Sequence, residues 1–444
     1  MTIMTKEHSF EKLVELRREM RHMNFYTRLG KVEQIVGMII EVSGLLASIG
    51  DVCEIRIPGK PSVLSEVVGF HDSITQIMPY DETDGIGYGN TVYNTGRKLR
   101  VRMSDALIGR TVDALGRPID GLGDIVGGTM LPISGKASNP MHRPEISEPI
   151  TLGVKAIDGM ITLGKGQRIG IFAGSGVGKS TLMGMIARNV TADVNVLALV
   201  GERGRELMEF LKKDLGPEGL KRSVVVVATS DNSAMLRNKC AMTATAIAEY
   251  FKNQGKDVLL MMDSLTRFCM AQREIGLSTG EPPVARGYPP SIYASLPKLL
   301  ERCGNFENGS ITGIYTVLVE GDDTNEPVAD TVRGIIDGHI MLSRKIAMTN
   351  HYPAIDVLAS LSRLMSSIAT PEQKQYAGQI RNMMSIYNDN TDLISIGAYK
   401  SGSNPALDTA IKKIDAINGF LTQKVDEKFT FEQTVSEMKR IVTS

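Results

Sequence analysis

A glycine-rich segment between Arg168 and Ala187, RIGIFAGSGVGKSTLMGMIA, constrains the fold more than any other part of the sequence. The apolar run from Ile169 to Phe172 predicts a buried strand, and the residues after the glycines predict a helix. A strand, a glycine-rich turn and a helix that opens with Gly-Lys-Ser together indicate a phosphate-binding loop. The residues expected to surround the phosphates are Gly174, Ser175, Gly176, Val177, Gly178, Lys179, Ser180 and Thr181.

Each residue type in this loop suits the binding of a nucleotide phosphate. Glycine lets the backbone curl so that its N–H groups point inward, and the helix N-terminus adds partial positive charge. Lys179 is long enough to reach the β- and γ-phosphates, and the Ser180 hydroxyl is a ligand for Mg²⁺. The usual motif begins with glycine, whereas this chain has Ala173. A plain glycine-rich turn is the alternative, which the flanking strand and helix disfavour.

Strands and helices alternate after this loop. Segments with helical spacing lie between nearly continuous apolar runs, which predict strands at residues 194–200, 223–228, 258–262, 311–319 and 338–342. This alternation predicts an α/β fold with a parallel sheet covered on both faces. Ligands of such sheets bind at the carboxyl ends of the strands. Lys179, Glu202 and Asp263 all fall at such ends.

Two carboxylates at these strand ends are candidates for the chemistry. Asp263 ends the apolar run VLLMMD, where it could hold Mg²⁺, although a helix N-cap is the alternative. Glu202, in GERGRE, could orient and polarise a water that attacks the γ-phosphate. A surface ion pair with Arg203 or Arg205 is the alternative for Glu202, and position in the sequence does not separate this role from the catalytic one.

Two further residues have open interpretations. Arg363 lies in the apolar stretch LASLSRLM, where a buried guanidinium would need a negative partner. That partner is either a carboxylate of the same fold or the γ-phosphate on a neighbouring subunit. Tyr352, in HYPAID, is either a stacking platform for adenine or a core tyrosine.

Changes in residue pattern along the chain predict four parts. Residues 1–26 predict an amphipathic helix, either packed on its own domain or serving as a docking arm for a partner. Residues 27–103 contain several short alternating strands, including Leu99 to Met103, which favour a small closed β-barrel. Residues 104–370 hold the α/β core with the glycine-rich connection that leads into it. Residues 371–444 predict a helical domain, with helices at 372–387, 407–420 and 431–442.

Composition excludes several classes of protein. Lysine plus arginine (50) equals aspartate plus glutamate (50), and aromatic residues make up 5% of the chain, so nucleic-acid binding is not expected. The four cysteines, Cys53, Cys240, Cys269 and Cys303, form no C-x-x-C pair, which disfavours zinc and disulfides and favours a reducing cytoplasm. The sequence shows no signal peptide and no membrane-spanning stretch. We therefore expect a cytoplasmic protein that docks on a membrane complex at most.

The motifs together resemble one family closely. GSGVGKST, GERGRE, LLMMDSLTR, ARGYPPS, EGDDTNEP, DGHIMLSR, HYPAID and LSRLM occur in that order. They resemble the ATPases of type III protein export, which are related to the catalytic head of rotary ATP synthases. The similarity extends from about Gly30 to about Phe420, and residues 320–344 look more like the flagellar branch than the virulence branch. IGAYKSGSNP also resembles the family, although Asn404 stands where aspartate is expected.

The resemblance implies a fold and a site. It implies a RecA-like phosphate-loop ATPase core with an N-terminal small β-barrel and a C-terminal helical domain, assembled as a homohexameric ring. ATP and Mg²⁺ would lie at each subunit interface, and hydrolysis would drive the delivery and unfolding of export substrates. The implied roles are water activation by Glu202, Mg²⁺ binding by Asp263, a finger in trans from Arg363, adenine stacking on Tyr352, and proximity to the phosphates for Arg203 and Arg267.

The resemblance also implies partners. In this family the N-terminal arm binds a stator-like regulatory protein and the ring binds a coiled-coil stalk protein. Export substrates, their chaperones and the membrane export apparatus, which the ring contacts peripherally, are further expected partners.

Other classes remain as alternatives. One is the ATPase of a virulence-type injectisome. A rotary ATP synthase subunit is another, but a non-catalytic one would lack Glu202 and a catalytic one would have an acidic C-terminal segment. A hexameric RNA translocase should show basic and aromatic stacking positions, which the composition does not support.

Overall fold

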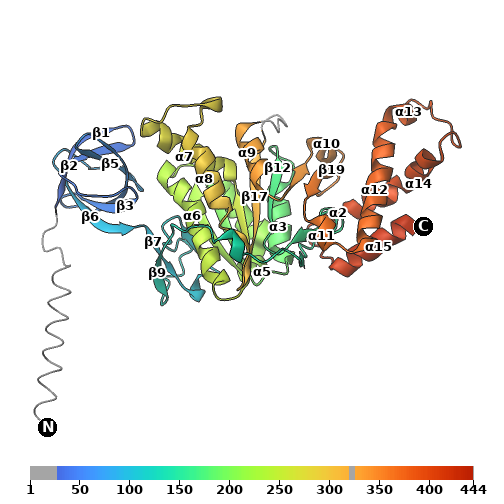
Figure 1. Cartoon of the computed structure of the whole chain (residues 1–444), viewed down its shortest axis with the longest axis horizontal. Coiled ribbons are helices and arrows are strands. Elements are labelled where there is room, and N and C mark those ends of the chain that lie inside the picture. The colour runs from blue at the N-terminus through green and yellow to red at the C-terminus, as the bar shows by residue number, and fades with distance from the viewer. Residues whose placement is uncertain (1–27, 320–325, 444) are drawn as a thin grey trace, which may run out of the picture. The chain divides into compact units, whose positions relative to one another are not determined.

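A computed structural model describes residues 28–319 and 326–443 of the chain (Figure 1). The contacts divide the chain into two compact units, one ending at Arg97 and the other beginning at Lys98. The helix predicted for residues 1–26 lies outside the described residues. No described helix is long and apolar enough to cross a membrane.

The first unit contains a closed β-barrel, as the alternating pattern predicts. Its strands are joined in the order β1-β2-β5-β4-β3-β6. Apolar side chains such as Val32, Ile40, Ile55 and Ile77 fill the interior, because alternate residues of each strand point inward. The strands of the barrel are β1 (Gly30–Val36), β2 (Ile39–Ser43), β3 (Asp51–Arg56), β4 (Val63–His71), β5 (Ile74–Pro79) and β6 (Thr91–Lys98).

One strand that the alternating pattern assigned to the barrel lies elsewhere. The segment around Val101 forms β7 (Arg100–Met103), which pairs with β9 (Thr129–Pro132) instead of closing the barrel. The alternation of Val101 and Met103 correctly indicates a strand with one buried face. The prediction that this strand belongs to the barrel is wrong, because period-two alternation does not say which sheet supplies the partner.

The second unit is built on a sheet with the strand order β19-β18-β12-β17-β15-β13-β14-β8. The strands are parallel apart from β19, which runs antiparallel to β18, and β16, which pairs antiparallel with β17. The prediction of a parallel sheet is therefore confirmed for the central strands. The strands are β8 (Thr111–Asp113), β12 (Arg168–Ala173), β13 (Val194–Glu202), β14 (Ser223–Thr229), β15 (Asp257–Asp263), β16 (Gly304–Asn305), β17 (Ser310–Leu318), β18 (Gly338–Leu342) and β19 (Ile355–Ser362).

Helices bury both faces of this sheet (Figure 1). Helix α6 (Ala234–Lys252) packs on β13, β14 and β15, and α3 (Lys179–Asn189) buries its apolar face in the core that contains Ile169 and Ile171. Residues 204–215 form α4 (Gly204–Glu209) followed by a π-helical segment, Phe210–Leu215. Other helices of the core are α2 (Lys155–Met160), α5 (Gly216–Leu220), α7 (Leu265–Ser278), α8 (Pro290–Leu300), α9 (Pro327–Ile335), α10 (Arg344–Met348) and α11 (Met365–Ile368).

The C-terminal segment is helical, as predicted. Its long helices are α12 (Pro371–Asp389), α14 (Pro405–Leu421) and α15 (Phe431–Thr443), and a short helix, α13 (Thr391–Ser395), lies between the first two. Helices α12, α14 and α15 all pack on α2, and α12 also packs on β19. Phe420 and Met438 belong to the same apolar cluster as the strand residues of the core. The helical segment is therefore packed onto the core within one compact unit.

Candidate nucleotide-binding site

The predicted phosphate-binding loop joins β12 to α3 at the carboxyl edge of the sheet. Gly176 and Gly178 have φ angles of 79° and 86°, which L side chains rarely adopt and glycine adopts freely. Gly178 is the N-cap of α3, and no side chain caps the first N–H groups of this helix. Those N–H groups and the helix dipole are therefore available to an anion.

The alanine at the first motif position is accommodated by the strand. Ala173 is still part of β12, where it pairs with Leu318 and Leu342, and it is 1% exposed. Because its φ is not positive, the backbone at this position does not need glycine. Val177, in the middle of the loop, is 2% exposed and anchors the loop in the core.

Lys179 and the two candidate carboxylates lie together. The Lys179 Nζ atom lies 2.5 Å from Asp263 Oδ1 and 3.9 Å from Glu202 Oε1. The three residues come from α3, β15 and β13, and β13 pairs in parallel with β15, so their carboxyl ends meet at one edge. Asp263 is 4% exposed and also accepts a hydrogen bond of 2.7 Å from Thr316 Oγ1. The predicted juxtaposition of Lys179, Glu202 and Asp263 is present.

The environment of Glu202 changes its acidity. The pKa of Glu202 is raised to about 7, first by burial and then by the neighbouring Asp263 carboxylate, while the Lys179 ammonium opposes the shift. A carboxyl group with a pKa near neutrality is suited to take up a proton at physiological pH. Glu202 is therefore half-buried beside a cation rather than part of a surface ion pair. Arg203, the alternative partner, instead contacts Glu206 at 3.3 Å on the surface.

The hydroxyl groups of the loop differ in their surroundings. Ser180 is exposed at the first turn of α3, whereas the Thr181 hydroxyl is hydrogen-bonded to Asp214. Ser180 is thus the more accessible of the two hydroxyls.

Arg267 lies beside the strand end that carries Glu202. A Cβ atom placed on Gly201 would lie 3.1 Å from the Arg267 Cβ, so the stem of this arginine packs on the backbone next to Glu202. Its Nε atom is buried and makes no hydrogen bond to any described residue. A buried donor without a partner is costly, which favours an acceptor supplied by a ligand.

Tyr352 lies against the phosphate-binding loop. A Cβ atom on Gly178 would lie 3.4 Å from two carbon atoms of the Tyr352 ring, and the side chain is 40% exposed. The Tyr352 carbonyl accepts a 2.9 Å hydrogen bond from the Gln423 backbone N–H. A half-exposed ring at this place is available for stacking and is not a plain core tyrosine.

Arg363 is not brought to the same edge of the sheet. It follows β19, whose last residue, Ser362, pairs with Gly338 at the start of β18. Because β18 is parallel to β12, Arg363 lies at the amino edge of the sheet, opposite the loop. The Arg363 side chain is exposed, so it does not need the negatively charged partner that a buried guanidinium would require. The Arg363 Nη2 atom donates a long bond of 3.5 Å to the Arg333 carbonyl.

Two residues with a structural role at the site carry no sequence signal. Thr316 lies inside the apolar strand β17, and its hydroxyl contacts Asp263 because β15 and β17 are neighbours. Gln423 follows the last turn of α14 and binds the backbone of Tyr352. Neither residue belongs to a sequence motif, so only the folded structure reveals these contacts.

Comparisons with known proteins agree with this geometry. Residues 153–362 match the nucleotide-binding domain of the ATP synthase alpha/beta family, and residues 32–96 match the beta-barrel domain of that family. Residues 369–440 match the T3SS EscN ATPase C-terminal domain.

Individual relatives are similar over nearly their whole length. The flagellum-specific ATP synthase of Bacillus subtilis is 53% identical, with 93% of this chain and 95% of the relative covered. The type 3 secretion system ATPase of Xanthomonas euvesicatoria is 51% identical, with 95% of each covered. The solved structure of the assembled ATPase EscN from enteropathogenic E. coli is 44% identical and has a TM-score of 0.88, with 93% of this chain and 100% of the EscN chain covered. A second structure, EscN in complex with its central stalk EscO, has a TM-score of 0.87.

Proposed function

The chain belongs to the ATP synthase alpha/beta family, in the branch of flagellar and type III secretion ATPases, and on this premise we propose that it hydrolyses MgATP in a homohexameric ring that drives flagellar protein export. The chain is an ATPase with a RecA-like core. The observation that carries the proposal is that Lys179 lies close to both Asp263 and Glu202. Lys179 is also the first residue of α3, whose N-terminal N–H groups have no side-chain cap.

Each residue of the site has a distinct part in this reaction. Lys179 and the loop N–H groups bind the β- and γ-phosphates and offset their charge. Glu202 lies beside this position, and in its ionised form it orients and polarises the attacking water. Tyr352 holds the adenine by stacking. Arg203 directly follows Glu202 in the chain, and the stem of Arg267, on α7, packs against Gly201. Both arginines contribute positive charge toward the phosphates.

The residues also fit a magnesium ion. Asp263 and the exposed Ser180 hydroxyl supply oxygen atoms, which are the ligands that Mg²⁺ prefers. When bound, the ion would neutralise charge on the β- and γ-phosphates. The Asp263 carboxylate is held for this task by Thr316, which fixes one of its oxygens.

The proposal includes a ring because Arg363 faces away from the site of its own chain. An exposed arginine at the opposite edge of the sheet reaches a nucleotide only if that nucleotide belongs to a neighbouring subunit. Such a finger supplies positive charge to the transition state in trans. The assembled EscN structure, which is similar over 93% of this chain, supports an oligomer.

The partners follow from the same family. The EscN–EscO complex supports a coiled-coil stalk protein as a partner of the ring. We assign residues 1–26 as the arm for a stator-like regulatory protein, and place the ring in the cytoplasm, peripherally on a membrane export apparatus that receives substrates and chaperones. Deleting residues 1–26 should leave ATP binding intact and abolish co-purification of the regulatory protein.

Mixing two inactive variants tests the ring and the trans finger. Lys179→Ala subunits keep Arg363, and Arg363→Ala subunits keep the phosphate-binding loop. Mixed rings therefore contain some interfaces with both groups intact, and partial ATPase activity should return. Lys179→Ala mixed with Glu202→Gln is the matched control, because both changes damage the same side of the interface and no activity should return. Mixed rings that form but stay inactive in the first pair would refute the trans assignment.

A virulence-type export system is the second candidate, because the C-terminal match and the 51% identical relative belong to type III secretion. Replacing the native chain with the Lys179→Ala variant separates the two. Loss of swimming supports the flagellar role, whereas normal swimming with loss of injected effector proteins supports the second candidate.

A further inference from the structure

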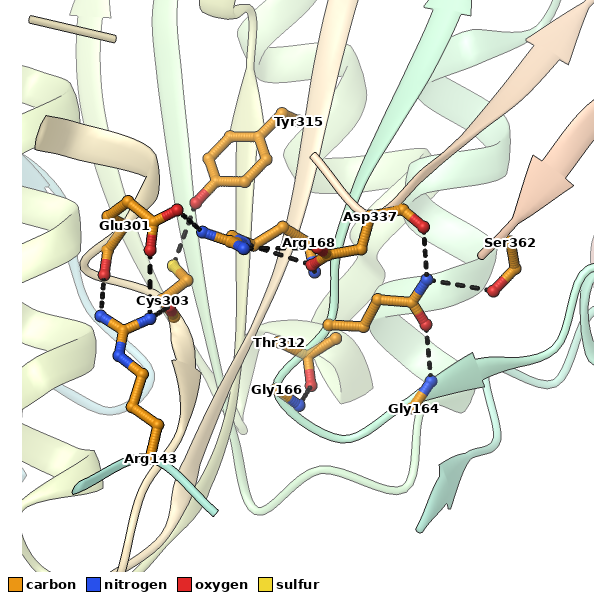
Figure 2. Close-up of polar contacts among 11 residues, drawn as sticks. Arg143, Gly164, Gly166, Arg168, Glu301, Cys303, Thr312, Tyr315, Asp337 and Ser362 are labelled. Atoms are coloured by element: carbon orange, nitrogen blue, oxygen red, sulfur yellow. Dashed lines mark hydrogen bonds and ion pairs between the residues drawn. The ribbon is translucent and has the colours of Figure 1, made fainter. Parts of the chain in front are cut away.

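A group of buried and partly buried polar side chains lies at the amino edge of the central sheet, where Figure 2 labels Arg168, Asp337 and Ser362. We call it the edge network and define it as Gln167, Arg168, Asp337 and Ser362. Arg168 begins β12 and Gln167 directly precedes it, Asp337 directly precedes β18, and Ser362 ends β19. The network therefore joins three neighbouring segments at the point where the chain continues into Arg363.

Arg168 holds the carboxylate of Asp337 from two sides. Asp337 Oδ2 accepts hydrogen bonds from the Arg168 backbone N–H at 3.0 Å and from its Nε at 3.2 Å, and Oδ1 accepts from Nη2 at 3.3 Å. The Arg168 Nη1 atom pairs with Glu301, which Arg143 contacts in turn (Figure 2). Asp337 is thus fixed at its side chain, and its backbone N–H donates to the Arg168 carbonyl at 2.8 Å.

Gln167 uses all the hydrogen-bonding capacity of its amide nitrogen within this network. Its side chain is fully buried. Its Oε1 accepts from the Gly164 N–H at 2.8 Å, and its Nε2 donates to the Asp337 carbonyl at 3.2 Å and to Ser362 Oγ at 3.0 Å. Figure 2 labels the three partners of this amide group, Gly164, Asp337 and Ser362.

The Asp337 carbonyl is shared between Gln167 and Arg363. The Arg363 backbone N–H donates to this oxygen at 3.0 Å. The guanidinium itself is exposed and has the 3.5 Å contact to Arg333, which is too long to fix it firmly. The place of Arg363 is therefore set mainly at its backbone, through the oxygen that Gln167 also binds.

We propose that Gln167 is a positioning residue for Arg363, holding it where it reaches the nucleotide of the neighbouring subunit. The inference rests on the proposed trans role of Arg363. A displacement of about 1 Å in a positioned group can cost ~10²-fold in rate. Gln167→Met keeps the length of the side chain and removes the amide, so we expect turnover by assembled rings to fall by up to about 10²-fold. Nucleotide affinity should stay unchanged, because the loop is intact.

Gln167 also directly precedes β12, which leads to the phosphate-binding loop, so an effect on the loop of its own subunit is the competing explanation. Mixed rings separate the two. Gln167→Met should regain activity when mixed with Lys179→Ala, whose Arg363 is correctly held, and should regain none with Arg363→Ala. If Gln167→Met instead regained activity with Arg363→Ala and none with Lys179→Ala, the proposal would be overturned. That result would show that the substitution impairs the phosphate-binding loop of its own subunit.

Gln373→Met is the matched control. Gln373 is also fully buried, and its Nε2 donates to Thr162 Oγ1 at 2.7 Å and to the Asp158 carbonyl at 3.0 Å, neither of which is bonded to Arg363. Its loss should lower thermal stability to a similar degree and leave the turnover of folded rings near that of the wild type. If Gln373→Met lost as much turnover as Gln167→Met, general destabilisation would explain both losses, and the proposal would be overturned.

Ser362→Ala provides a milder variant should Gln167→Met fail to fold. It removes one acceptor of the Gln167 amide and should give a smaller loss with the same pairing pattern. The inference would be contradicted if Ser362→Ala regained ATPase activity in rings mixed with Arg363→Ala but not in rings mixed with Lys179→Ala. If Lys179→Ala and Arg363→Ala do not restore each other, the proposed trans function fails, and this outcome is distinct from a failure of the Gln167 proposal.

Discussion

At the scale of single residues, the site is governed by one cation between two carboxylates. Lys179 lies 2.5 Å from Asp263 and 3.9 Å from Glu202, and all three side chains are mostly withdrawn from solvent. Burial strengthens the interaction between charges and disfavours any charge that is not balanced. Burial raises the pKa of Glu202, and the Asp263 carboxylate adds to the rise because one ammonium group does not fully balance two carboxylates.

Replacing Glu202 by glutamine should separate binding from hydrolysis. The amide keeps the shape of the side chain but cannot polarise water in the way a carboxylate does. We expect Glu202→Gln to bind ATP with near-normal affinity and to hydrolyse it ~10²–10⁴-fold more slowly. Equilibrium binding of a fluorescent ATP analogue and steady-state phosphate release measure the two effects. A loss of less than about tenfold would be too small for a water-activating role.

The same residue should make stability depend on pH. Burial and Asp263 raise the pKa of Glu202 from 4.5 to about 7, so the folded chain favours the protonated form. Below pH 4.5 the residue is protonated in both the folded and the unfolded chain. As pH rises through about 7, the folded chain must ionise a half-buried group, and stability falls relative to a glutamine variant.

Thermal unfolding of Glu202→Gln and the wild type at pH 5 and pH 8 measures this effect. The variant should gain stability over the wild type mainly at pH 8. Glu218→Gln is the control, because the Glu218 side chain is 79% exposed and its replacement should shift unfolding little at either pH. A gain that is larger at pH 5 would contradict the assignment.

At the scale of elements, the turn between β12 and α3 determines what the site binds. The loop must leave a buried strand, expose its N–H groups and enter a helix within a few residues. Gly178 makes this possible because its φ of 86° places it in the left-handed region directly at the N-cap. The absence of a Cβ atom also leaves room for the Tyr352 ring at 3.4 Å.

Gly178→Ala should therefore weaken nucleotide binding. A Cβ atom at this φ costs roughly 1–2 kcal/mol and contacts the Tyr352 ring, so the turn should distort. Gly255→Ala is the matched control, because Gly255 has a φ of 82° with open space around it and lies far along the chain from the loop. Both variants should lose thermal stability, whereas affinity for an ATP analogue should fall in Gly178→Ala alone. Equal affinity in the two variants would argue against the turn as the binding element.

At the scale of the whole molecule, the described chain carries the phosphate-binding loop and the proposed arginine finger at opposite edges of its sheet. The loop, Glu202 and Asp263 lie at the carboxyl edge, and Arg363 lies at the amino edge with the edge network behind it. If Arg363 acts in trans, as we propose, a single subunit lacks a complete site, and two neighbouring subunits assemble one.

Activity should accordingly depend on protein concentration. An arginine finger is typically worth ~10³–10⁵ in rate, so specific activity should rise steeply as subunits assemble. Arg363→Ala should still bind ATP and should show a much flatter dependence. Phosphate release measured across a dilution series, with the oligomeric state followed by light scattering, provides the check. Constant specific activity across the assembly range would show that a single subunit is catalytically complete.

Local sequence patterns determined the elements and part of the site. The apolar runs predicted β12, β13, β15 and β18 because a strand buried on both faces needs consecutive apolar residues. The loop motif predicted Lys179 at a helix N-terminus. Parallel strands end at a common edge, so Glu202 and Asp263 could be expected near it.

Tertiary structure alone decided which elements pair and which edge each residue occupies. Val101 and Met103 alternate like barrel residues, yet β7 pairs with β9. Arg363 lies opposite the loop because β19 runs antiparallel to β18, and no local pattern distinguishes an antiparallel edge strand from a parallel one. The amide of Gln167 meets Asp337 and Ser362, which are 170 and 195 residues away in the chain. Such contacts form from the packing of distant segments, whereas propensity and periodicity act over a few neighbouring residues.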